Sequence, residues 1–498
     1  MFLRPLALSW ALSAALLAGC GTTVVNPVTG QAERTVMDEP MEIAEGKKAH
    51  GEILKSYGAY PDAKLQAYVN EVGQKLARNS HRAQLPWTFT VLDSPEVNAF
   101  ALPGGYVYIT RGILAHMESE ADMAGVIGHE IGHVTARHGA QRATRQQTAG
   151  LGVLAATVLG AILESQAGLQ GGTEMLGQVA QGVAAGYVAH YSREQELQAD
   201  ALGAEYLARN RYDPGNMVDV IGVLYSQERY AADQARARGE EVSQGESWLA
   251  SHPSNEQRLR DIRQHAAAHA GEYGDDGRER FLKMIEGMRF GESPSQGLTR
   301  GRHFYHPELG IAITAPTGWR IVNADDSLTL MAPDRGAALR LMGVPPQSGR
   351  SHDEIIRQLL KSPQGRTTRG QINGLPATHF QGQATGQDGR PQRLEFTLVT
   401  GPRQANYLLL YLAADAGALQ RHFNQLMAAE KTFRAMTDDD RQTARPWQIR
   451  VVPMPRGGFA ELQRQAEVSE AQLRLLNGVY DGGRVPAAGR PVKTVVAR

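Results

Sequence analysis

The chain has 498 residues, more than one hydrophobic core normally organises, so we expect several domains. Lysine plus arginine and aspartate plus glutamate both total 52. Because these charges cancel, the composition does not favour a nucleic-acid partner, and none is predicted. The single cysteine excludes an intramolecular disulfide framework and a zinc site built from several thiolates.

The N-terminus has the features of an export signal. Arg4 precedes an apolar stretch over residues 6–17 that is too short to span a membrane. The segment that ends in Gly19-Cys20-Gly21 resembles the lipobox of bacterial lipoproteins. This resemblance implies a signal peptide over residues 1–19, acylation of Cys20, and a periplasmic protein anchored to the outer membrane through its lipid. An uncleaved anchor or a fortuitous apolar start is the alternative.

Two helices are predicted between residues 38 and 80, after a tether over 20–37, because apolar side chains recur there at helical spacing. Residues 87–92 alternate as in a strand, and Pro103-Gly104-Gly105 marks a turn before a β-rich run. We therefore expect a hairpin or an edge strand, followed by one long amphipathic helix over residues 119–147.

The sequence after this helix is rich in glycine and alanine as far as residue 189, which suggests a movable cover. A further helix is expected from Ser192 to Asn210. Asp213-Pro214 then has the pattern of an N-cap followed by a first-turn proline, and helical sequence continues to residue 288.

Residues 289–302 are rich in glycine, serine and proline, which predicts a linker. Beyond it, a separate α+β domain is predicted over residues 303–436. Its expected strands are 311–314, 328–331, 339–342, 394–400 and 407–412, and its expected helices are 351–361 and 415–433. No catalytic constellation is found in it, so we expect an adaptor for a substrate or a partner.

The motif that carries chemistry is His129-Glu130-Ile131-Gly132-His133, inside the long predicted helix. Residues four apart lie one turn apart on the same face of a helix, so both imidazoles can point at one metal ion with Glu130 beside it. Alone, the motif is only suggestive, because a solvated or core helix can carry it by chance.

The helix predicted from Ser192 strengthens this interpretation. Catalytic zinc takes three protein ligands and keeps one position open, and Glu196 is our candidate for the third ligand. Asp200, one turn further, can accept the free N–H of a zinc-bound histidine, and Arg193, one turn earlier, can balance the carboxylates. An exposed charged helix is the alternative.

The sequence resembles the M48 peptidases over roughly residues 45–265. The resemblance rests on Asn98-Ala99-Phe100-Ala101-Leu102-Pro103-Gly104-Gly105, on the HExxH motif, on Arg193-x-x-Glu196-x-x-Ala199-Asp200, and on Ser251-His252-Pro253 with Arg258. It implies that residues 38–288 form a mainly α-helical zinc peptidase domain with a small edge sheet.

By the same resemblance, Asn98 and Ala99 bind the substrate backbone, and His252 and Arg258 stabilise the oxyanion. In some relatives the histidine that matches His252 instead occupies the open zinc position and restrains activity. In the expected reaction, a zinc-bound water attacks the peptide carbonyl while Glu130 acts as general base. An edge strand at Asn98 would pair with an extended peptide, which favours unfolded substrates.

The C-terminal segment, residues 445–498, is similar to a LysM repeat. The similarity rests on Ile449-Arg450-Val451-Val452, on Leu475-Leu476-Asn477-Gly478 and on Gly489. It implies a small βααβ module with peptidoglycan as a candidate partner. Arg456-Gly457-Gly458-Phe459 replaces the usual Gly-Asp-Thr, so a packing module that binds no glycan is the alternative.

The sequence therefore predicts a multidomain, lipid-anchored zinc endopeptidase with one Zn2+ per chain, which cleaves unfolded or misassembled envelope proteins. A chaperone or scaffold with latent protease activity blocked by His252 is the main alternative. A peptidoglycan hydrolase is the third, and it would need to cut glycan-linked peptides.

Overall fold

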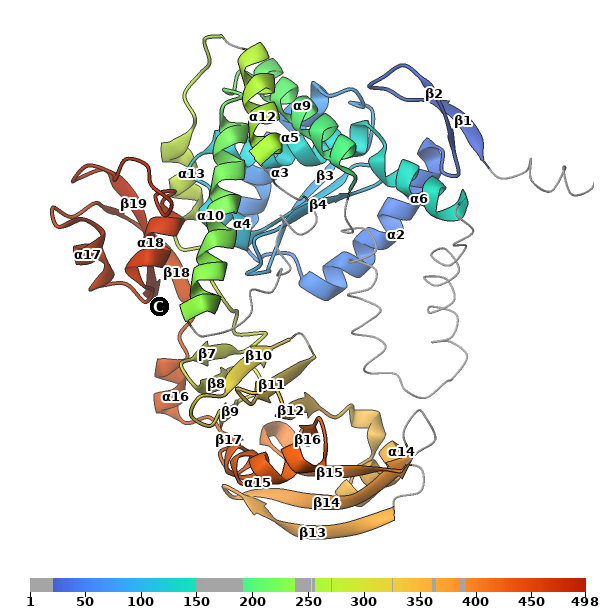
Figure 1. The fold of residues 1–498 in the computed structure, drawn as a ribbon, viewed down its shortest axis with the longest axis vertical. Helices are drawn as coiled ribbons and strands as arrows, with labels where there is room; N and C mark the ends of the chain where they lie inside the picture. Colours follow the sequence, from blue (N-terminus) through green and yellow to red (C-terminus); the bar gives the residue numbers. More distant parts are fainter. Residues whose placement is uncertain are drawn as a thin grey trace, which may run out of the picture. The chain divides into compact units, whose positions relative to one another are not determined.

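The computed structural model describes residues 21–148, 191–237, 252, 256–269, 271–324, 326–360, 364–385 and 391–498 (Figure 1). The expected signal peptide with Cys20 and the glycine-rich stretch 149–189 lie outside these residues. The chain divides into two compact units, Met1–Phe290 with Gln448–Val496, and Gly291–Trp447 with Ala497–Arg498. The fold is mixed α/β, with a mainly helical N-terminal region followed by a β-rich region.

Helices dominate the first unit. Those described are α2 (Glu39–Tyr57), α3 (Ala63–Arg78), α4 (Arg111–His116), α5 (Glu120–Thr135), α6 (His138–Thr148), α9 (Arg193–Arg209), α10 (Asn216–Ala237), α12 (Glu256–Ala268), α13 (Arg278–Ile285), α17 (Gly458–Gln463) and α18 (Glu470–Leu476). The two helices predicted between residues 38 and 80 are confirmed as α2 and α3, each capped by an aspartate side chain. The helix predicted from Ser192 is confirmed as α9, where Ser192 and Gln195 form a capping box.

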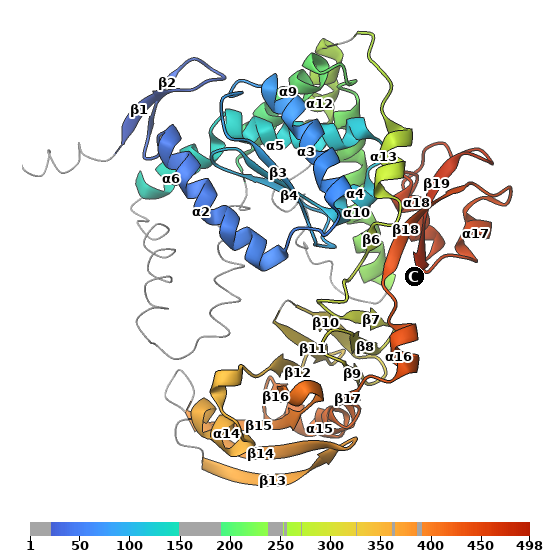
Figure 2. The same ribbon diagram turned by 180° about the vertical axis from the view of Figure 1, so that it is seen from behind.

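A small three-stranded sheet, of which β3 and β4 are labelled in Figure 2, lies among these helices. Its strand order is β3–β5–β4. β3 (Thr88–Leu92) runs parallel to β5 (Tyr106–Thr110), and β4 (Ala99–Leu102) pairs antiparallel with β5 at the edge of the sheet. Gly104 and Gly105 turn the chain between β4 and β5 with φ of 81° and 99°, a region that favours glycine. The predicted hairpin with an edge strand is therefore confirmed.

Helices cover both faces of this sheet. On one face, Ile53 of α2 joins Leu92, Phe100 and Tyr108 in a buried cluster. Successive strand residues point to opposite faces, so Phe89, three residues before Leu92, lies on the other face. There it meets α3 at Gly73, where a Cβ would lie only 2.4 Å from the ring of Phe89. α5 contacts β4 and β5, which places the sheet edge beside that helix.

The prediction of a single helix over residues 119–147 is wrong, because this segment forms two helices, α5 and α6. The break lies at Ala136 and Arg137, and Arg137 has a φ of 61°, which a right-handed helix cannot contain. The Arg137 guanidinium pairs with buried Glu42 at 2.9 Å and donates to the Met37 carbonyl at 2.6 Å. Partners distant in sequence hold the break, so periodicity could not reveal it.

The start of α5 is also anchored. Glu120, the first residue of α5, accepts hydrogen bonds from the hydroxyls of Tyr68 and Tyr212, both at 2.7 Å. Arg280 of α13 pairs with the same carboxylate at 2.7 Å. Both ends of α5 are therefore held by charged or polar contacts with other segments.

Residues 22–35 form a hairpin where a plain tether was expected. β1 (Thr22–Val25) pairs antiparallel with β2 (Ala32–Thr35). Asn26 in the turn accepts from the Val28 amide at 2.9 Å and donates to the Ala136 carbonyl at 3.1 Å, just after α5. This tertiary hydrogen bond ties the hairpin to the helical region, and the polar local sequence gave no indication of it.

Residues 448–496, here called the C-terminal module, belong to the first compact unit. β18 (Trp447–Pro453) lies between β19 (Pro491–Ala497) and β6 (Arg289–Phe290) in a three-stranded sheet. α17 and α18 lie between β18 and β19 in the chain, which gives the expected βααβ order.

A buried lysine joins the C-terminal module to the loop before α5. The ammonium group of Lys493 donates to the carbonyls of Ala115 and Met117 at 3.0 and 2.6 Å, and it pairs with Glu118 at 2.8 Å. Its side chain is 0% exposed. Burial lowers the pKa of Lys493, whereas the charge of Glu118 opposes that shift. The module therefore contributes directly to the surroundings of α5.

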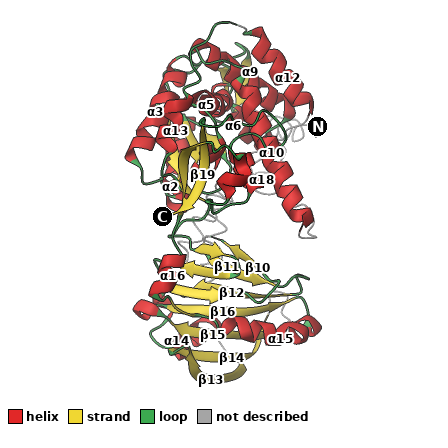
Figure 3. Ribbon diagram, turned by 90° about the vertical axis from the view of Figure 1, so that its left-hand side faces the viewer, coloured by secondary structure: helices red, strands yellow, loops and turns green. Residues whose placement is uncertain are grey.

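The second unit is built on an antiparallel seven-stranded sheet in the order β10–β11–β12–β16–β15–β14–β13 (Figure 3). Its strands are β10 (Arg320–Asn323), β11 (Ser327–Met331), β12 (Ala337–Gly343), β13 (Gln364–Ile372), β14 (Leu375–Thr385), β15 (Pro391–Thr400) and β16 (Asn406–Ala413). A four-stranded sheet, β17–β9–β8–β7, consists of β7 (Leu298–Arg300), β8 (His303–His306), β9 (Ile311–Thr314) and β17 (Arg434–Ala435). The helices are α14 (His352–Leu360), α15 (Ala416–Glu430) and α16 (Asp438–Thr443).

α14 and α15 cover opposite faces of the seven-stranded sheet. Leu408 of β16 packs in a cluster with Ile355 of α14, whereas its neighbour Leu409 packs with Leu426 of α15. The predicted strands and helices of this α+β region are confirmed, but β8, β10, β13, β14, β17 and α16 were not predicted. Residues 364–371 of β13 are all exposed, so no alternation of buried apolar residues marks the strand.

Two further expectations differ from the structure. Part of the predicted linker, Leu298–Arg300, forms β7, because Leu298 is buried in a cluster with Tyr305. The helix expected to open at Asp213-Pro214 begins at Asn216 as α10. Asp213 instead accepts from the Gly215 amide at 2.8 Å, which makes a turn before the helix.

Replacing Lys493 by Met should destabilise the first unit, because the substitution leaves two carbonyls and Glu118 without their buried cation. We expect the free energy of unfolding to fall by about 3 kcal/mol, measured by urea unfolding of the full chain. The control is Arg490→Met, which removes an exposed cation of the same module and should have little effect. Equal unfolding midpoints for the two variants would contradict the anchoring role of Lys493.

Candidate metal centre

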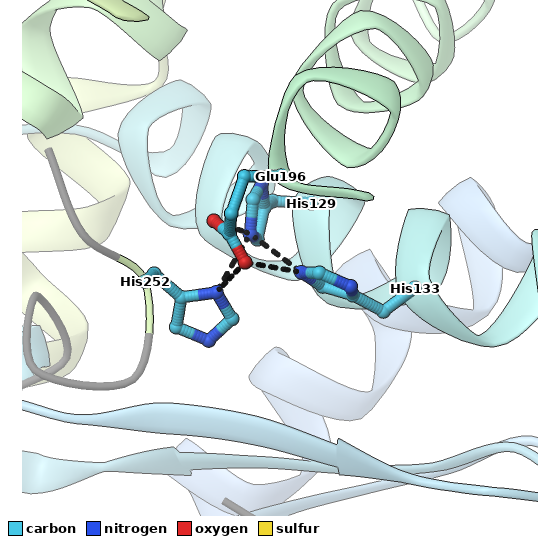
Figure 4. Close-up of side chains that lie close together, drawn as sticks. All are labelled: His129, His133, Glu196 and His252. Carbon is cyan, nitrogen blue, oxygen red and sulfur yellow. Dashed lines mark hydrogen bonds and ion pairs between the residues drawn. The ribbon is translucent and has the colours of Figure 1, made fainter. Parts of the chain in front are cut away.

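Two histidines of α5 point to the same place (Figure 4). The Nε2 atoms of His129 and His133 lie 3.0 Å apart. Glu130 follows His129 on the same helix, and all three side chains are buried. The placement of the motif on a helix is confirmed, and both imidazoles can serve one metal ion.

α9 brings Glu196 to the histidines because α5 and α9 pack backbone to backbone. A Cβ added to Gly132 would lie 2.9 Å from the Ala199 carbonyl oxygen, and one added to Gly203 would lie 3.2 Å from the His129 nitrogen. Only glycines allow this approach without displacing a neighbour. Gly132 occupies one of the unspecified positions of HExxH, so its importance comes from α9 rather than from the metal.

His252 supplies a fourth donor from a separate loop before α12 (Figure 4). Its Nδ1 lies 3.2 Å from Nε2 of His129 and 2.9 Å from Oε1 of Glu196. The same Glu196 oxygen lies 3.4 Å from Nε2 of His133. His129, His133, Glu196 and His252 thus each offer one ligand atom within 4.8 Å of the others.

This donor set fits zinc. Ligand atoms about 2.1 Å from a tetrahedral zinc ion lie about 3.4 Å from one another. Oε1 of Glu196 lies 2.9 Å from the donor of His252 and 3.4 Å from that of His133, and Oε2 of Glu196 lies 3.6 Å from that of His129, values close to this separation. With His252 in the set, four protein donors would be available to a zinc ion. If His252 withdraws, His129, His133 and Glu196 remain with one open position.

An ion pair lies behind the ligand atoms. Asp200 lies 2.8 Å from Nδ1 of His129, where the sequence predicted it. Arg258 donates to Asp200 at 2.7 and 2.9 Å and lies 3.0 Å from Glu196. It also donates to the carbonyl of His252 at 2.8 Å. Arg258 therefore links the loop of His252 to the carboxylates of α9.

The other predicted site residues occupy different surroundings. Arg193 was expected to balance the carboxylates, but it is exposed on the first turn of α9, and Arg258 reaches the carboxylates from α12. Asn98 and Ala99 are buried at the start of the edge strand β4. Asn98 there accepts a hydrogen bond from the Thr110 amide at 3.0 Å.

Two residues that the sequence did not indicate, His138 and Tyr191, contact His133, and a third, Gln198, contacts His138. Nδ1 of His133 lies 2.9 Å from Nδ1 of His138, whose Nε2 lies 2.9 Å from Oε1 of Gln198. The ring of Tyr191 stacks on His133, with ring centres 3.9 Å apart and planes at 18°. Residues five apart lie on different faces of a continuous helix, so only the break at Arg137 brings His138 back to His133.

Burial and charge set the ionisation of these groups. Burial raises the pKa of Glu196 to about 7, and Arg258 opposes that shift. Burial lowers the pKa of His133 well below its ordinary value and that of His252 to about 3. Burial also acts to raise the pKa of Asp200, but the charge of Arg258 holds it below its usual range. Both imidazoles are therefore neutral near pH 7, the form that binds a metal.

The family model described as Peptidase family M48 matches residues 63–266, a range that includes every donor of this site. Over residues 63–266, here called the M48 region, the chain is therefore similar to peptidase family M48. The histidines and the glutamate of this M48 region form an intact His-His-Glu zinc site. The match does not extend to the second unit or to the C-terminal module.

Known proteases resemble the M48 region. The chain is 30% identical over 240 residues to the beta-barrel assembly-enhancing protease of Yersinia pestis. This matched segment covers 48% of this chain and 47% of that protein. It is 32% identical over 205 residues to the protein of the same name in Escherichia coli (strain K12), with 41% and 39% covered. It is 26% identical over 260 residues to the mitochondrial metalloendopeptidase OMA1 of Schizosaccharomyces pombe, with 50% and 69% covered. The chain thus spans less than half of the first two relatives.

In the described part of the chain, no helix has the length and apolar character needed to cross a membrane.

Replacing Gly132 by Ala should weaken zinc binding, because a methyl group 2.9 Å from the Ala199 carbonyl pushes α9 and Glu196 away from α5. We expect the zinc affinity to fall by about tenfold, as for other changes that misplace metal ligands, measured by competition with a chelator.

The control for this variant is Gly222→Ala in α10, where an added Cβ meets nothing within 4 Å. It should keep the zinc affinity and raise the free energy of unfolding by about 0.5–1 kcal/mol. A Gly132→Ala protein with wild-type zinc affinity would show that α5 and α9 do not need this contact distance.

Proposed function

We propose that the protein is a zinc endopeptidase that cleaves unfolded or misassembled proteins of the cell envelope. The observation that carries the proposal is the buried convergence of His129, His133 and Glu196 beside Glu130. The similarity of the M48 region to proteases supports the reaction class. The preference for unfolded chains is proposed from the edge strand β4 and the envelope location from the lipobox resemblance, since the chain covers less than half of the first two relatives.

The reaction assigns separate tasks to the site residues. Zinc, when bound, supplies a Lewis acid that activates water and polarises the scissile carbonyl. Glu130 accepts the proton of the attacking water and returns it to the leaving amine. His252 and Arg258 are the groups proposed to stabilise the oxyanion. Arg258 donates hydrogen bonds to Asp200 and to the His252 carbonyl. Its proposed contribution to oxyanion stabilisation is therefore indirect, because it holds His252 in position.

The substrate is proposed to bind as an extended strand along β4. This strand is at the edge of its sheet and contacts α5, the helix that carries His129 and His133. Main-chain pairing with an edge strand requires an extended peptide and little sequence specificity. Asn98 and Ala99, at the start of β4, are the residues proposed to bind the substrate backbone. Unfolded chains meet this requirement better than folded proteins.

A second candidate function is a latent protease that serves as an envelope chaperone or scaffold. The observation that favours it is the position of His252, whose Nδ1 completes the set of four donors. With His252 as a fourth ligand, a bound zinc ion would keep no position for water, and hydrolysis would require His252 to withdraw. The two candidates share the zinc site and differ in the rate of hydrolysis.

We also propose the lipid anchor on Cys20, the outer-membrane location and a LysM-like role for the C-terminal module. The lipobox resemblance supports the first two. The βααβ order of β18, α17, α18 and β19 supports the third. Peptidoglycan is the partner that a LysM-like role would imply, whereas Lys493 gives the module a packing role that needs no glycan.

Replacing Glu130 by Gln should abolish proteolysis and keep the metal, because the general base is lost while the three ligands remain. We expect casein cleavage to fall by about 100-fold or more, with zinc content unchanged by elemental analysis. Glu71→Gln, an exposed carboxylate on α3, is the control and should cleave normally. If wild type and Glu130→Gln cleave casein equally, the enzyme proposal fails.

Replacing His252 by Ala decides between the two candidate functions. Loss of casein cleavage with zinc retained supports oxyanion stabilisation by His252, because a transition-state contact is removed. A gain in cleavage supports the latent protease, because the fourth position opens. His265→Ala on α12 controls for loss of a histidine near this segment, and its rate should match wild type.

Replacing Cys20 by Ser should release the mature protein from membranes, because acyl chains are the proposed anchor. Cell fractionation with palmitate labelling measures this. Continued membrane attachment of unlabelled Cys20→Ser protein would contradict the lipid anchor.

Co-sedimentation of the released protein with purified peptidoglycan would support a LysM-like role for the C-terminal module. Recovery of the protein in the soluble fraction would contradict glycan binding.

A further inference from the structure

A chain of hydrogen bonds begins at His133, the second histidine of the HExxH motif, on the side opposite the other metal donors. His133 presents Nε2 to the other donors, and its Nδ1 lies 2.9 Å from Nδ1 of His138. His138, the first residue of α6, is 0% exposed. Its Nε2 lies 2.9 Å from Oε1 of Gln198, which is on α9 two residues after Glu196. The chain therefore runs from α5 through α6 back to the helix of the third ligand.

The proton positions along this chain follow from valence. A neutral imidazole carries one N–H and one lone pair. When Nε2 of His133 gives its lone pair to zinc, its Nδ1 must carry the hydrogen, so Nδ1 of His138 must accept. His138 then carries its own hydrogen on Nε2 and donates it to the amide oxygen of Gln198. In this arrangement every polar atom of the chain meets a complementary partner.

The opposite arrangement disables the ligand. If His138 carries its hydrogen on Nδ1, it donates to Nδ1 of His133, and the hydrogen of His133 moves to Nε2. That nitrogen lies 3.0 Å from Nε2 of His129 and 3.4 Å from Glu196, and a protonated nitrogen there cannot bind a metal. The tautomer of His138 therefore decides whether His133 is available as a ligand.

We propose that His138 and Gln198 are positioning residues that fix His133 in the tautomer required for zinc binding. His129 has a different partner, because the carboxylate of Asp200 lies 2.8 Å from its Nδ1. The stack of Tyr191 on the face of His133 holds the same ring in plane, so the hydrogen bonds need to set only its protonation. The proposal rests on the zinc site of the proposed function and extends it to the outer contacts of one ligand.

The test measures zinc affinity by competition with a chelator in the full chain. His138→Ala should weaken zinc binding by about 10- to 100-fold, the usual effect of removing the partner of a metal-bound histidine. Gln198→Leu should weaken it by a smaller factor, because His138 then loses the acceptor that selects its tautomer. Gln198→Glu offers only acceptor oxygens, so it should bind zinc at least as tightly as wild type.

The control is His50→Ala, which removes a half-buried histidine with a comparable hydrogen bond, 2.7 Å to the hydroxyl of Tyr108. Its zinc affinity should equal that of wild type. Circular dichroism of the metal-free proteins shows whether a variant has lost its fold. Should His138→Ala unfold, the opposed effects of Gln198→Leu and Gln198→Glu at the half-buried surface of α9 still decide the matter.

Nitrogen NMR of the zinc-loaded, histidine-labelled protein observes the tautomers directly. We expect His138 to carry its hydrogen on Nε2 and His133 on Nδ1. A hydrogen on Nδ1 of His138, or wild-type zinc affinity in folded His138→Ala, would overturn the proposal. If the wild-type protein itself binds no zinc, the proposed function fails instead, so the two failures are distinguishable.

Discussion

The close packing of α5 against α9 is the constraint on which the site depends. Gly132 and Gly203 let the two backbones approach until a Cβ on either would crowd the opposite helix. This approach brings His129 and His133 of one helix to Glu196 of the other in a buried environment. Buried polar donors are costly unless they find partners, and a divalent cation satisfies all of them at once. The metal chemistry therefore depends on the packing of these two helices.

α5 is held by segments from the whole length of the first unit. Glu120 at its start is bound by two tyrosines and by Arg280, and Lys493 of the C-terminal module is bound to the loop just before it. Arg137 just after its end is bound to Glu42. A helix fixed at both ends can hold its ligands in one geometry without help from the metal. This gives the C-terminal module a structural reason to belong to the first unit.

The second unit contributes no donor to this site. Among the residues that the structure describes, the group that meets the geometry of a metal site is formed by His129, His133, Glu196 and His252. The seven-stranded sheet has α14 on one face and α15 on the other, so both faces have a core of their own. What the unit offers to a partner is its surface, including the exposed edge strand β13.

The sequence by itself determined the helices that carry the ligands and the donor types that select zinc. Spacing alone placed His129 and His133 on one face, and the capping residues of α9 fixed the helix of Glu196. These features are local, because helix periodicity and caps act within a few residues. Strands with buried apolar alternation were found for the same reason, whereas polar β13 was not.

Only the tertiary structure decided which distant groups meet. The break at Arg137, the contact of His138 with His133, and the exchange of Arg193 for Arg258 beside the carboxylates all depend on contacts between separate segments. The same holds for the fourth donor, since the family resemblance left two roles open for His252 and only folding places its Nδ1 beside Glu196. Such pairings join residues far apart in the chain, and no local pattern encodes them.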